Sequence, residues 1–246
     1  MLEAVMILRD LILINEKISR DIYRLVVESD SFQNSKPGQF VQLQIDPEIF
    51  TLRRPFGIAG IDENRVEIFY RVVGRGTKFL TNKKSGEEID LLKPLGNGFN
   101  FDSAEKIFLV GGGVGLAPLL FLSRKAVNKK IHVFAGGRTQ DDLFWKDLFN
   151  GEFTGFVSDR FPFDELEKFA RDESPDLICT CAPEIMMRGV ARVAKNLKIP
   201  CQVSMEKRMA CGVGACLGCS IDTIHGRRKV CKDGPGFNSE EVFFDE

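Results

Sequence analysis

The chain has 246 residues, of which 43% are hydrophobic and 28% are charged, and its formal net charge is −1. The near-neutral charge argues against a nucleic acid or an anionic membrane surface as partner, and the length allows two modest domains with buried cores. No stretch reaches the roughly 18 apolar residues of a membrane span and the N-terminus lacks a secretory signal pattern, so we expect a cytoplasmic protein.

The first domain, expected over residues 1–100, is predicted to be an antiparallel β-barrel. Apolar residues recur at every second position in FVQLQI (40–45) and in RVEIFYRVV (65–73), a pattern typical of strands with one buried face. We expect Gln42, Glu67 and Phe69 to lie on the opposite face. Glycine- and proline-rich turns separate these short strands, which favours a barrel.

The second domain, expected over residues 101–206, begins with KIFLVGG (106–112), a continuous apolar run typical of a strand buried on both faces. Helical and strand patterns then alternate, which predicts an α/β fold with a doubly wound parallel sheet. The predicted helices cover residues 116–127, 141–149, 164–171 and 184–197, and the further strands cover 131–135, 153–157, 176–182 and 201–206.

The third module, expected over residues 207–246, is rich in glycine and cysteine and shows little periodicity. Its cysteines follow a C-x4-C-x2-C pattern with a fourth thiol downstream: Cys211, Cys216, Cys219 and Cys231. In a reducing compartment these thiols are expected to be ligands and not disulfides, and their spacing is that of plant-type 2Fe-2S centres. A zinc site is the alternative. Lys207, Arg208 and Lys232 bracket the cysteines, and positive charge suits an anionic cluster.

A glycine-rich turn joins the first strand of the second domain to its first helix, in LVGGGVGLAPLLFL (109–122). Such turns let backbone N–H groups approach a pyrophosphate at the positive end of the helix. The candidate residues are Gly111, Gly112, Gly113, Val114 and Gly115. The alternative is a tight connection without a ligand. Arg138, in the loop AGGRT after the next strand, is a candidate contact to a ribose or phosphate, or else a solvated arginine.

Two stretches of the barrel carry phosphate-binding chemistry. RRPFGIAG (53–60) places two arginines before a proline and an aromatic ring, and a guanidinium binds phosphate through two hydrogen bonds. YRVVGRGT (70–77) places Arg71 beside a glycine turn in which Gly76 and Thr77 offer backbone amides and a hydroxyl. A phosphate-bearing cofactor and a plain barrel surface are the two interpretations.

These signals, in this order, resemble the ferredoxin–NADP reductase superfamily, whose members join an FAD-binding barrel to an NAD(P)-binding α/β domain. The resemblance implies that Arg54 holds the FAD pyrophosphate and that Phe56 lies beside the isoalloxazine. Gly57 would lie near flavin N5, without the hydroxyl that the family's serine has there. The remaining residues that the resemblance implies for FAD are Pro55, Phe69, Tyr70, Arg71, Gly76 and Thr77.

The resemblance extends to the second domain. The loop from Gly111 to Pro118 resembles the nicotinamide-dinucleotide loop, and CAPEIMM (181–187) resembles a segment whose cysteine lies close to the nicotinamide. That cysteine is Cys181 here, followed by an alanine where the family has glycine; a buried apolar role is its alternative. Arg138 would favour the 2′-phosphate of NADP, whereas Asp141 and Asp142 nearby would repel it, and the resemblance implies NAD.

The cysteine module is similar to that of the electron-transfer subunits of class B dihydroorotate dehydrogenases. This resemblance implies FAD and a 2Fe-2S cluster on this chain, and an FMN-containing partner subunit that oxidises dihydroorotate to orotate. Electrons would then cross the cluster and the FAD to NAD+, because flavin exchanges electrons both singly and in pairs. The partner is expected to dock around residues 207–236, in a heterotetramer with two copies of each subunit.

Two other functions remain open. One is the flavin subunit of a hydrogenase or of a ferredoxin-dependent transhydrogenase, and the other is a nucleotide-binding redox sensor without turnover. Cys179 and Cys201 fall on predicted strands and are expected to be core thiols. His132 lies on a buried strand and is expected to be structural, and His225 receives no role.

Overall fold

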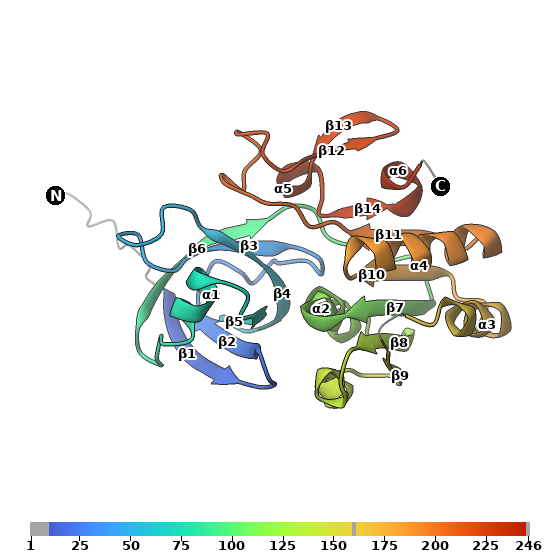
Figure 1. The fold of residues 1–246 in the computed structure, drawn as a ribbon, viewed down its shortest axis with the longest axis horizontal. Helices are drawn as coiled ribbons and strands as arrows, with labels where there is room; N and C mark the ends of the chain where they lie inside the picture. Colours follow the sequence, from blue (N-terminus) through green and yellow to red (C-terminus); the bar gives the residue numbers. More distant parts are fainter. Residues whose placement is uncertain (1–9, 159–160, 245–246) are drawn as a thin grey trace.

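The computed structural model of the chain describes residues 10–158 and 161–244. Residues 1–9, which begin both the predicted barrel domain and the stretch compared with a secretory signal, lie outside these ranges. Figure 1 shows a barrel beside a sheet flanked by helices, with the C-terminal segment lying across both. Every helix in the described ranges is too short or too polar to span a membrane.

Six antiparallel strands form a closed barrel, as the alternating pattern predicts. The elements of this domain are β1 (Asp10–Lys17), β2 (Ile22–Glu28), β3 (Phe40–Gln44), β4 (Arg54–Asp62), β5 (Arg65–Arg71), α1 (Arg75–Leu80) and β6 (Glu88–Leu95). The strand order is β1-β2-β5-β4-β3-β6, and pairing of β1 with β6 closes the ring. Val41, Leu43 and Ile68 fill the interior, where they are fully buried.

The outer face of the barrel is covered where the sequence pattern predicts exposed side chains. Gln42 and Glu67 lie on this face but are only 0% and 8% exposed. Gln42 lies under the loop of Gly212, and Glu67 lies under the first helix of the second domain. Phe69 packs against Trp145, with ring centroids 4.8 Å apart. Alternation identifies the inward face, whereas the outward face is buried because other modules pack on it.

The second domain is a doubly wound sheet, as predicted. Its parallel strands are β7 (Lys106–Gly112), β8 (Lys130–Gly137), β9 (Glu152–Val157), β10 (Leu177–Cys181) and β11 (Cys201–Ser204), and its α-helices are α2 (Leu116–Lys125), α3 (Phe163–Glu173) and α4 (Glu184–Leu197). Ile107 and Leu109 of β7 pack in the core with α2, and Phe108 and Val110 pack in the core with α4. Helices cover both faces of the sheet, which explains the continuous apolar run of β7.

The segment predicted as a helix over residues 141–149 is a 3₁₀ helix, η2 (Gln140–Asp147). Three residues per turn place Trp145 and Leu148 on one face. Trp145 is fully buried against Phe69 and Phe144. The other predicted helices of this domain form within two residues of their expected ends.

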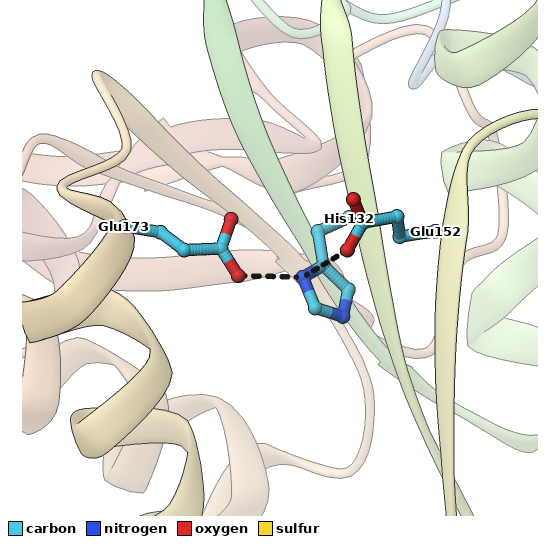
Figure 2. A group of neighbouring side chains, drawn as sticks. All are labelled: His132, Glu152 and Glu173. Carbon is cyan, nitrogen blue, oxygen red and sulfur yellow. Dashed lines mark hydrogen bonds and ion pairs between the residues drawn. The ribbon is translucent and has the colours of Figure 1, made fainter.

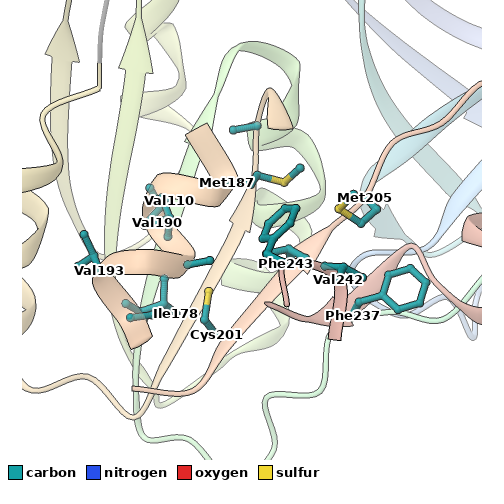
Figure 3. Close-up of a cluster of buried hydrophobic side chains, with 14 of the residues drawn as sticks. Val110, Ile178, Met187, Val190, Val193, Cys201, Met205, Phe237, Val242 and Phe243 are labelled. Carbon is teal, nitrogen blue, oxygen red and sulfur yellow. The ribbon is translucent and has the colours of Figure 1, made fainter. Parts of the chain in front are cut away.

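The C-terminal module contains short elements that its sequence does not predict: β12 (Ser220–Thr223), β13 (Gly226–Lys229), α5 (Val230–Asp233), β14 (Gly236–Asn238) and α6 (Ser239–Val242). β12 and β13 form a hairpin, and β14 pairs antiparallel with β11 at the edge of the six-stranded sheet. Figure 3 shows that Phe237, Val242 and Phe243 share a buried cluster with Ile178 and Met187. The module therefore shares a core with the α/β domain, and the domain boundary at residue 206 stays a prediction.

An ion-pair network joins the barrel to α2. Glu67 of β5 accepts hydrogen bonds from Arg24 of β2 and from Arg124 of α2. The Arg124 guanidinium fills the space beside Gly60, where any Cβ would collide with it. Hydrogen bonds between charged groups are among the stronger ones in proteins. The network therefore fixes the surface of β4 and β5 against the helix that follows the glycine loop.

Candidate functional site

In open α/β sheets, ligands bind beyond the carboxyl ends of two neighbouring strands at the point where the strand order reverses. In this sheet, with the order β9-β8-β7-β10-β11, that point lies between β7 and β10. The glycine loop follows β7 as a short 3₁₀ turn, η1 (Gly113–Gly115), and leads into α2. Gly113 has a φ of 57°, a conformation that favours glycine. A side chain at Gly115 would collide with the carbonyl oxygen of Cys181. The structure thus brings together the predicted dinucleotide loop and the cysteine predicted beside the nicotinamide.

The guanidinium of Arg71 lies at the same edge. Arg71 ends β5 of the barrel, and its Nη2 is 3.3 Å from the position that a Cβ on Gly113 would take. Asp21 and Asp142 pair with the guanidinium at N···O distances of 3.3 Å and 3.6 Å. The Arg71 side chain remains 34% exposed. Arg71, predicted as an FAD residue, therefore lies against the dinucleotide loop at the border of the two domains.

One carboxylate organises the loop after β8. Asp142 Oδ2 accepts hydrogen bonds from the backbone N–H groups of Arg138 and Thr139, at 2.9 Å and 3.1 Å. The Arg138 side chain is exposed. The sequence indicates the negative charge of Asp142, whereas its capping role and its pairing with Arg71 depend on the fold.

The two adjacent arginines before Pro55 have different surroundings. Arg53 forms a bidentate ion pair with Asp90 of β6, with 2.9 Å between Nη1 and Oδ1. Arg54 extends toward the first turn of α1, where the position of a Cβ on Gly76 is 3.4 Å from Nε. In that turn the Thr77 hydroxyl accepts hydrogen bonds from two backbone N–H groups. Arg54, Gly76 and Thr77 therefore lie together, as a pyrophosphate site requires.

The aromatic residues assigned to flavin separate into two groups. Phe56 is partly buried and its ring centroid lies 5.9 Å from that of Tyr70. The Tyr70 hydroxyl donates to Asn15 Oδ1 at 2.9 Å, and burial raises the pKa of Tyr70 above its usual range. Phe69 faces the second domain instead. Phe56 of β4, the strand that begins at Arg54, thus lies close to Tyr70, whereas Phe69 belongs to the domain interface.

Gly57 lies where the two predicted nucleotide sites meet. The position of a Cβ on Gly57 is 3.4 Å from Cδ of Pro118 in the first turn of α2. Gly57 also pairs with Phe40 of β3, whose ring packs in the core beneath the cysteine module. The residue expected near flavin N5 therefore contacts the helix that follows the dinucleotide loop.

The three cysteines of the α/β domain are buried. Cys181 is 3% exposed, and burial together with the nearby Glu206 carboxylate raises the pKa of its thiol. Burial likewise raises the pKa of Cys179 on β10 and of Cys201 on β11. All three are therefore protonated at neutral pH, which suits the core role expected for Cys179 and Cys201.

The four cysteines of the C-terminal module come together as two pairs. The thiol of Cys216 lies close enough to that of Cys211 to lower its pKa, and the thiol of Cys219 lies close enough to that of Cys231 to raise its pKa. All seven cysteines of the chain lie in the described ranges, and none of them forms a disulfide. The β12–β13 hairpin returns the chain so that α5 places Cys231 beside Cys219. Two pairs of thiols fit a 2Fe-2S centre, which is held by four cysteine thiolates.

Backbone N–H groups point at three of these sulfurs. Gly214 donates to Cys231 Sγ at 3.1 Å, Cys216 donates to Cys211 Sγ at 3.4 Å, and Cys231 donates to Cys219 Sγ at 3.4 Å. The backbone N–H groups of Val213 and Cys216 lower the pKa of Cys211 to about 6, whereas burial raises the pKa of Cys231. Donors of this kind stabilise thiolates and an anionic cluster.

The cysteine site is closed on one side and open on the other. Cys219 and Cys231 are buried, at 2% exposed each, whereas Cys216 is exposed. Leu217, which directly follows the exposed cysteine, and Val213, three residues before it, have 61% and 56% of their surface exposed. The open side is the part of the cysteine site that a second protein can reach.

Sequence reasoning missed the residue that ties this module to the barrel. The side-chain amide of Asn97 donates to the carbonyl oxygens of Lys232 and Asp233, next to Cys231. An asparagine between two glycines predicts a turn, and nothing in the sequence points to its partner. His225 lies exposed in the turn of the β12–β13 hairpin.

Comparison with known proteins relates these sites to one family. The model of the iron–sulfur cluster binding domain of dihydroorotate dehydrogenase B matches residues 206–243. The chain is 36% identical to the electron transfer subunit of dihydroorotate dehydrogenase B (NAD(+)) from Clostridium acetobutylicum, over 94% of this chain and 95% of that protein. It is 37% identical to the subunit of the same name from Clostridium perfringens, with the same coverage.

A solved structure resembles the whole fold. A chain of an NADH-dependent reduced ferredoxin–NADP oxidoreductase, studied for flavin-based electron bifurcation, superposes with a TM-score of 0.86. Its sequence is 27% identical, and the match covers 98% of this chain and 92% of that one. The barrel, the α/β domain and the C-terminal module therefore recur together in a second protein.

Proposed function

The chain belongs to the family of the electron transfer subunits of dihydroorotate dehydrogenase B, and from this membership we propose how its three modules work together. It is an oxidoreductase component that transfers electrons through FAD and a 2Fe-2S cluster. We infer that the electrons come from a partner subunit that oxidises dihydroorotate to orotate on FMN, and that they leave on NAD+.

The observation that carries this proposal is the contact between the three modules. Gly212 of the cysteine loop rests on Gln42 of β3, whose strand neighbour β4 carries the flavin motif. Gly57 of that motif touches Pro118 of the dinucleotide helix. The three candidate cofactor sites therefore border one another, an arrangement suited to passing electrons along one chain.

Flavin, when bound, can exchange electrons singly with an iron–sulfur centre and in pairs with a nicotinamide. The chain's own residues position the groups and set the charge around them. We assign the FAD pyrophosphate to Arg54 and the turn of Gly76 and Thr77, and the isoalloxazine to the surface formed by Phe56 and Gly57. Pro55 and Tyr70 support that surface, and the four cysteine thiolates hold the cluster.

We assign the nicotinamide nucleotide to the loop from Gly111 to Gly115, with Cys181 beside its reactive end. Arg71 is placed to contact this nucleotide in addition to FAD, because its guanidinium lies against Gly113 and is partly exposed. Asp142 favours NAD over NADP, because its carboxylate lies at the loop of Arg138 and would repel a 2′-phosphate there.

We infer that the catalytic partner docks on the open side of the cysteine site. Cys216 is exposed there, and Val213 and Leu217 offer apolar surface beside it. From the family resemblance we also propose an assembly with two copies of each subunit. Size-exclusion chromatography with light scattering on the copurified complex tests it, and a complex with one copy of each subunit would contradict it.

A second candidate function deserves a test because of the match to the ferredoxin–NADP oxidoreductase chain. In that case the partner would be a subunit with several iron–sulfur clusters in place of an FMN-containing dihydroorotate dehydrogenase. Affinity purification of the chain from its native cells separates the two candidates by the cofactors of the protein that copurifies.

The experiment that tests the main proposal is an anaerobic absorbance spectrum with iron and sulfide analysis. We expect bound flavin and two irons per chain, and bleaching of the flavin band when NADH is added. A colourless protein that holds one zinc ion in the cysteine module would overturn the proposal. Flavin without any response to NADH would favour the redox-sensor alternative.

A further inference from the structure

A second group of possible metal ligands lies at the amino-terminal edge of the sheet, opposite the edge of the glycine loop. His132 is the third residue of β8, Glu152 is the first residue of β9, and Glu173 is the last residue of α3. His132 and Glu152 are paired in the register of the two strands. Figure 2 shows both carboxylates directed at Nδ1 of the imidazole.

The separations between these atoms suit a small cation. Nδ1 of His132 is 3.1 Å from Oε1 of Glu173 and 3.7 Å from Oε2 of Glu152. The three ligand atoms all lie within 4.8 Å of one another. Zinc bonds of about 2.0–2.2 Å in tetrahedral geometry separate neighbouring ligand atoms by roughly 3.4 Å. The observed distances lie on either side of that value, so an ion between the three atoms needs only small side-chain shifts.

The imidazole is held by contacts outside the group. Its Nε2 lies 2.8 Å from the Thr154 hydroxyl, which fixes the ring with Nδ1 toward the carboxylates. The ring stacks on Phe134 with centroids 4.2 Å apart and meets Phe169 edge-on. Metal-bound histidines characteristically engage their second nitrogen in this way, which orients the ring and sets its tautomer.

The surroundings of the Glu152 and Glu173 carboxylates also suit a metal site. Lys106 Nζ lies 3.9 Å from Oε2 of Glu173, which leaves Oε1 as the atom directed at His132. His132 is buried, with 6% of its side chain exposed, whereas the Glu152 side chain is 79% exposed. The group is therefore rigid on the protein side and open at Glu152, where an ion and its water ligand can enter.

We propose that His132, Glu152 and Glu173 bind one divalent ion of the zinc class. One imidazole nitrogen and two carboxylate oxygens suit a borderline ion better than magnesium or calcium, which prefer oxygen ligands alone. The bound ion ties the end of α3 and the start of β9 to β8. This site is independent of the electron-transfer function, and it gives a role to the histidine that the sequence marks as structural.

The test uses the iron-replete holoprotein, so that the cluster thiols are occupied, and zinc chloride as the probe. Isothermal titration calorimetry should show one saturable site per chain, and zinc should raise the thermal midpoint. We expect Glu152→Gln and Glu173→Gln to weaken zinc binding at least tenfold. Thr154→Val removes only the support of the imidazole and should weaken binding by about 10–100-fold.

Glu165→Gln is the matched control, because it makes the same chemical change at an exposed position of α3. This variant should bind zinc as the unchanged protein does. The proposal is overturned if the unchanged protein shows no saturable zinc binding, or if Glu152→Gln and Glu173→Gln bind zinc as tightly as Glu165→Gln. Glu152 is largely exposed, so its variant keeps the test valid even where substitution of Glu173 disturbs folding.

Discussion

The backbone N–H of Cys231 points at Sγ of Cys219, 3.4 Å away, where α5 returns the chain to the cysteine loop. Both sulfurs are buried, so no other ligand can readily replace either one. We expect Cys231→Ser to abolish cluster assembly, with iron falling from two per chain to nearly none while FAD remains bound. Iron and sulfide analysis with the visible spectrum measures this outcome.

Cys179→Ala is the control for that variant, because it also removes a buried thiol but lies on β10 outside the cysteine pairs. It should keep a full complement of iron. Equal iron loss in both variants would indicate general unfolding, and full iron retention in Cys231→Ser would contradict the ligand assignment.

The two arginines of the flavin strand should differ in their effect on FAD. Arg54 is directed at the Gly76 turn, whereas Arg53 is committed to Asp90. A hydrogen bond to a charged group contributes about 1.5–3 kcal/mol, so Arg54→Gln should weaken FAD binding by roughly 10–100-fold. Arg53→Gln should leave FAD affinity within about threefold of the unchanged protein. Flavin fluorescence titration of the apoprotein gives both affinities, and equal losses would refute the distinction.

The buried carboxylate between the two domains should contribute measurably to stability. Glu67→Ala leaves the guanidiniums of Arg24 and Arg124 without their shared partner. Breaking a fully buried pair costs about 3–5 kcal/mol, and because both arginines are 35% exposed we expect about 1–3 kcal/mol here. Urea denaturation gives the free energy of unfolding.

Glu16→Gln provides the comparison, because Glu16 pairs with the same Arg24 but is 50% exposed. It should lower the free energy of unfolding by less than about 0.5 kcal/mol. If both variants destabilise the protein equally, the interface between the domains does not depend on Glu67.

Arg71 tests whether the barrel contributes to nicotinamide binding. Because its guanidinium lies against Gly113, we expect Arg71→Gln to raise the KM for NADH about tenfold in a dye-reduction assay. Arg65→Gln removes the same charge at the exposed, opposite end of β5 and should leave KM unchanged. A loss of FAD from Arg71→Gln with no change in KM would assign the residue to flavin alone.

The sequence predicts well those features that depend on local patterning. The continuous apolar run at Lys106–Gly112 and the alternation at Arg65–Arg71 both identify strands, and the cysteine spacing identifies the third module. The glycine loop at residues 111–115 and the arginine pair before Pro55 can be found from the sequence, because their composition is unusual for a plain turn and a plain strand. Their meeting at Gly57 and Pro118 depends on the packing of two domains, which no local pattern encodes.

Other features could not be predicted because long-range contacts decide them. Glu67 and Gln42 are buried by other modules and not by their own strands. The strand β14 is three residues long and forms because β11 offers it a sheet edge. Asn97 binds carbonyl groups more than 130 residues further along the chain. In each case the partner is distant in sequence, so the residue type alone carries little information.

The most direct test of electron transfer through the chain is anaerobic titration of the iron-replete holoprotein with NADH, followed by absorbance and by electron paramagnetic resonance. If the cluster and the flavin exchange electrons, NADH should bleach the flavin and also produce the paramagnetic signal of a reduced 2Fe-2S cluster. The Cys231→Ser variant should show the first change without the second. The account would be contradicted if NADH bleached the flavin of the unchanged protein while the cluster stayed oxidised, although dithionite reduced that cluster in the same preparation.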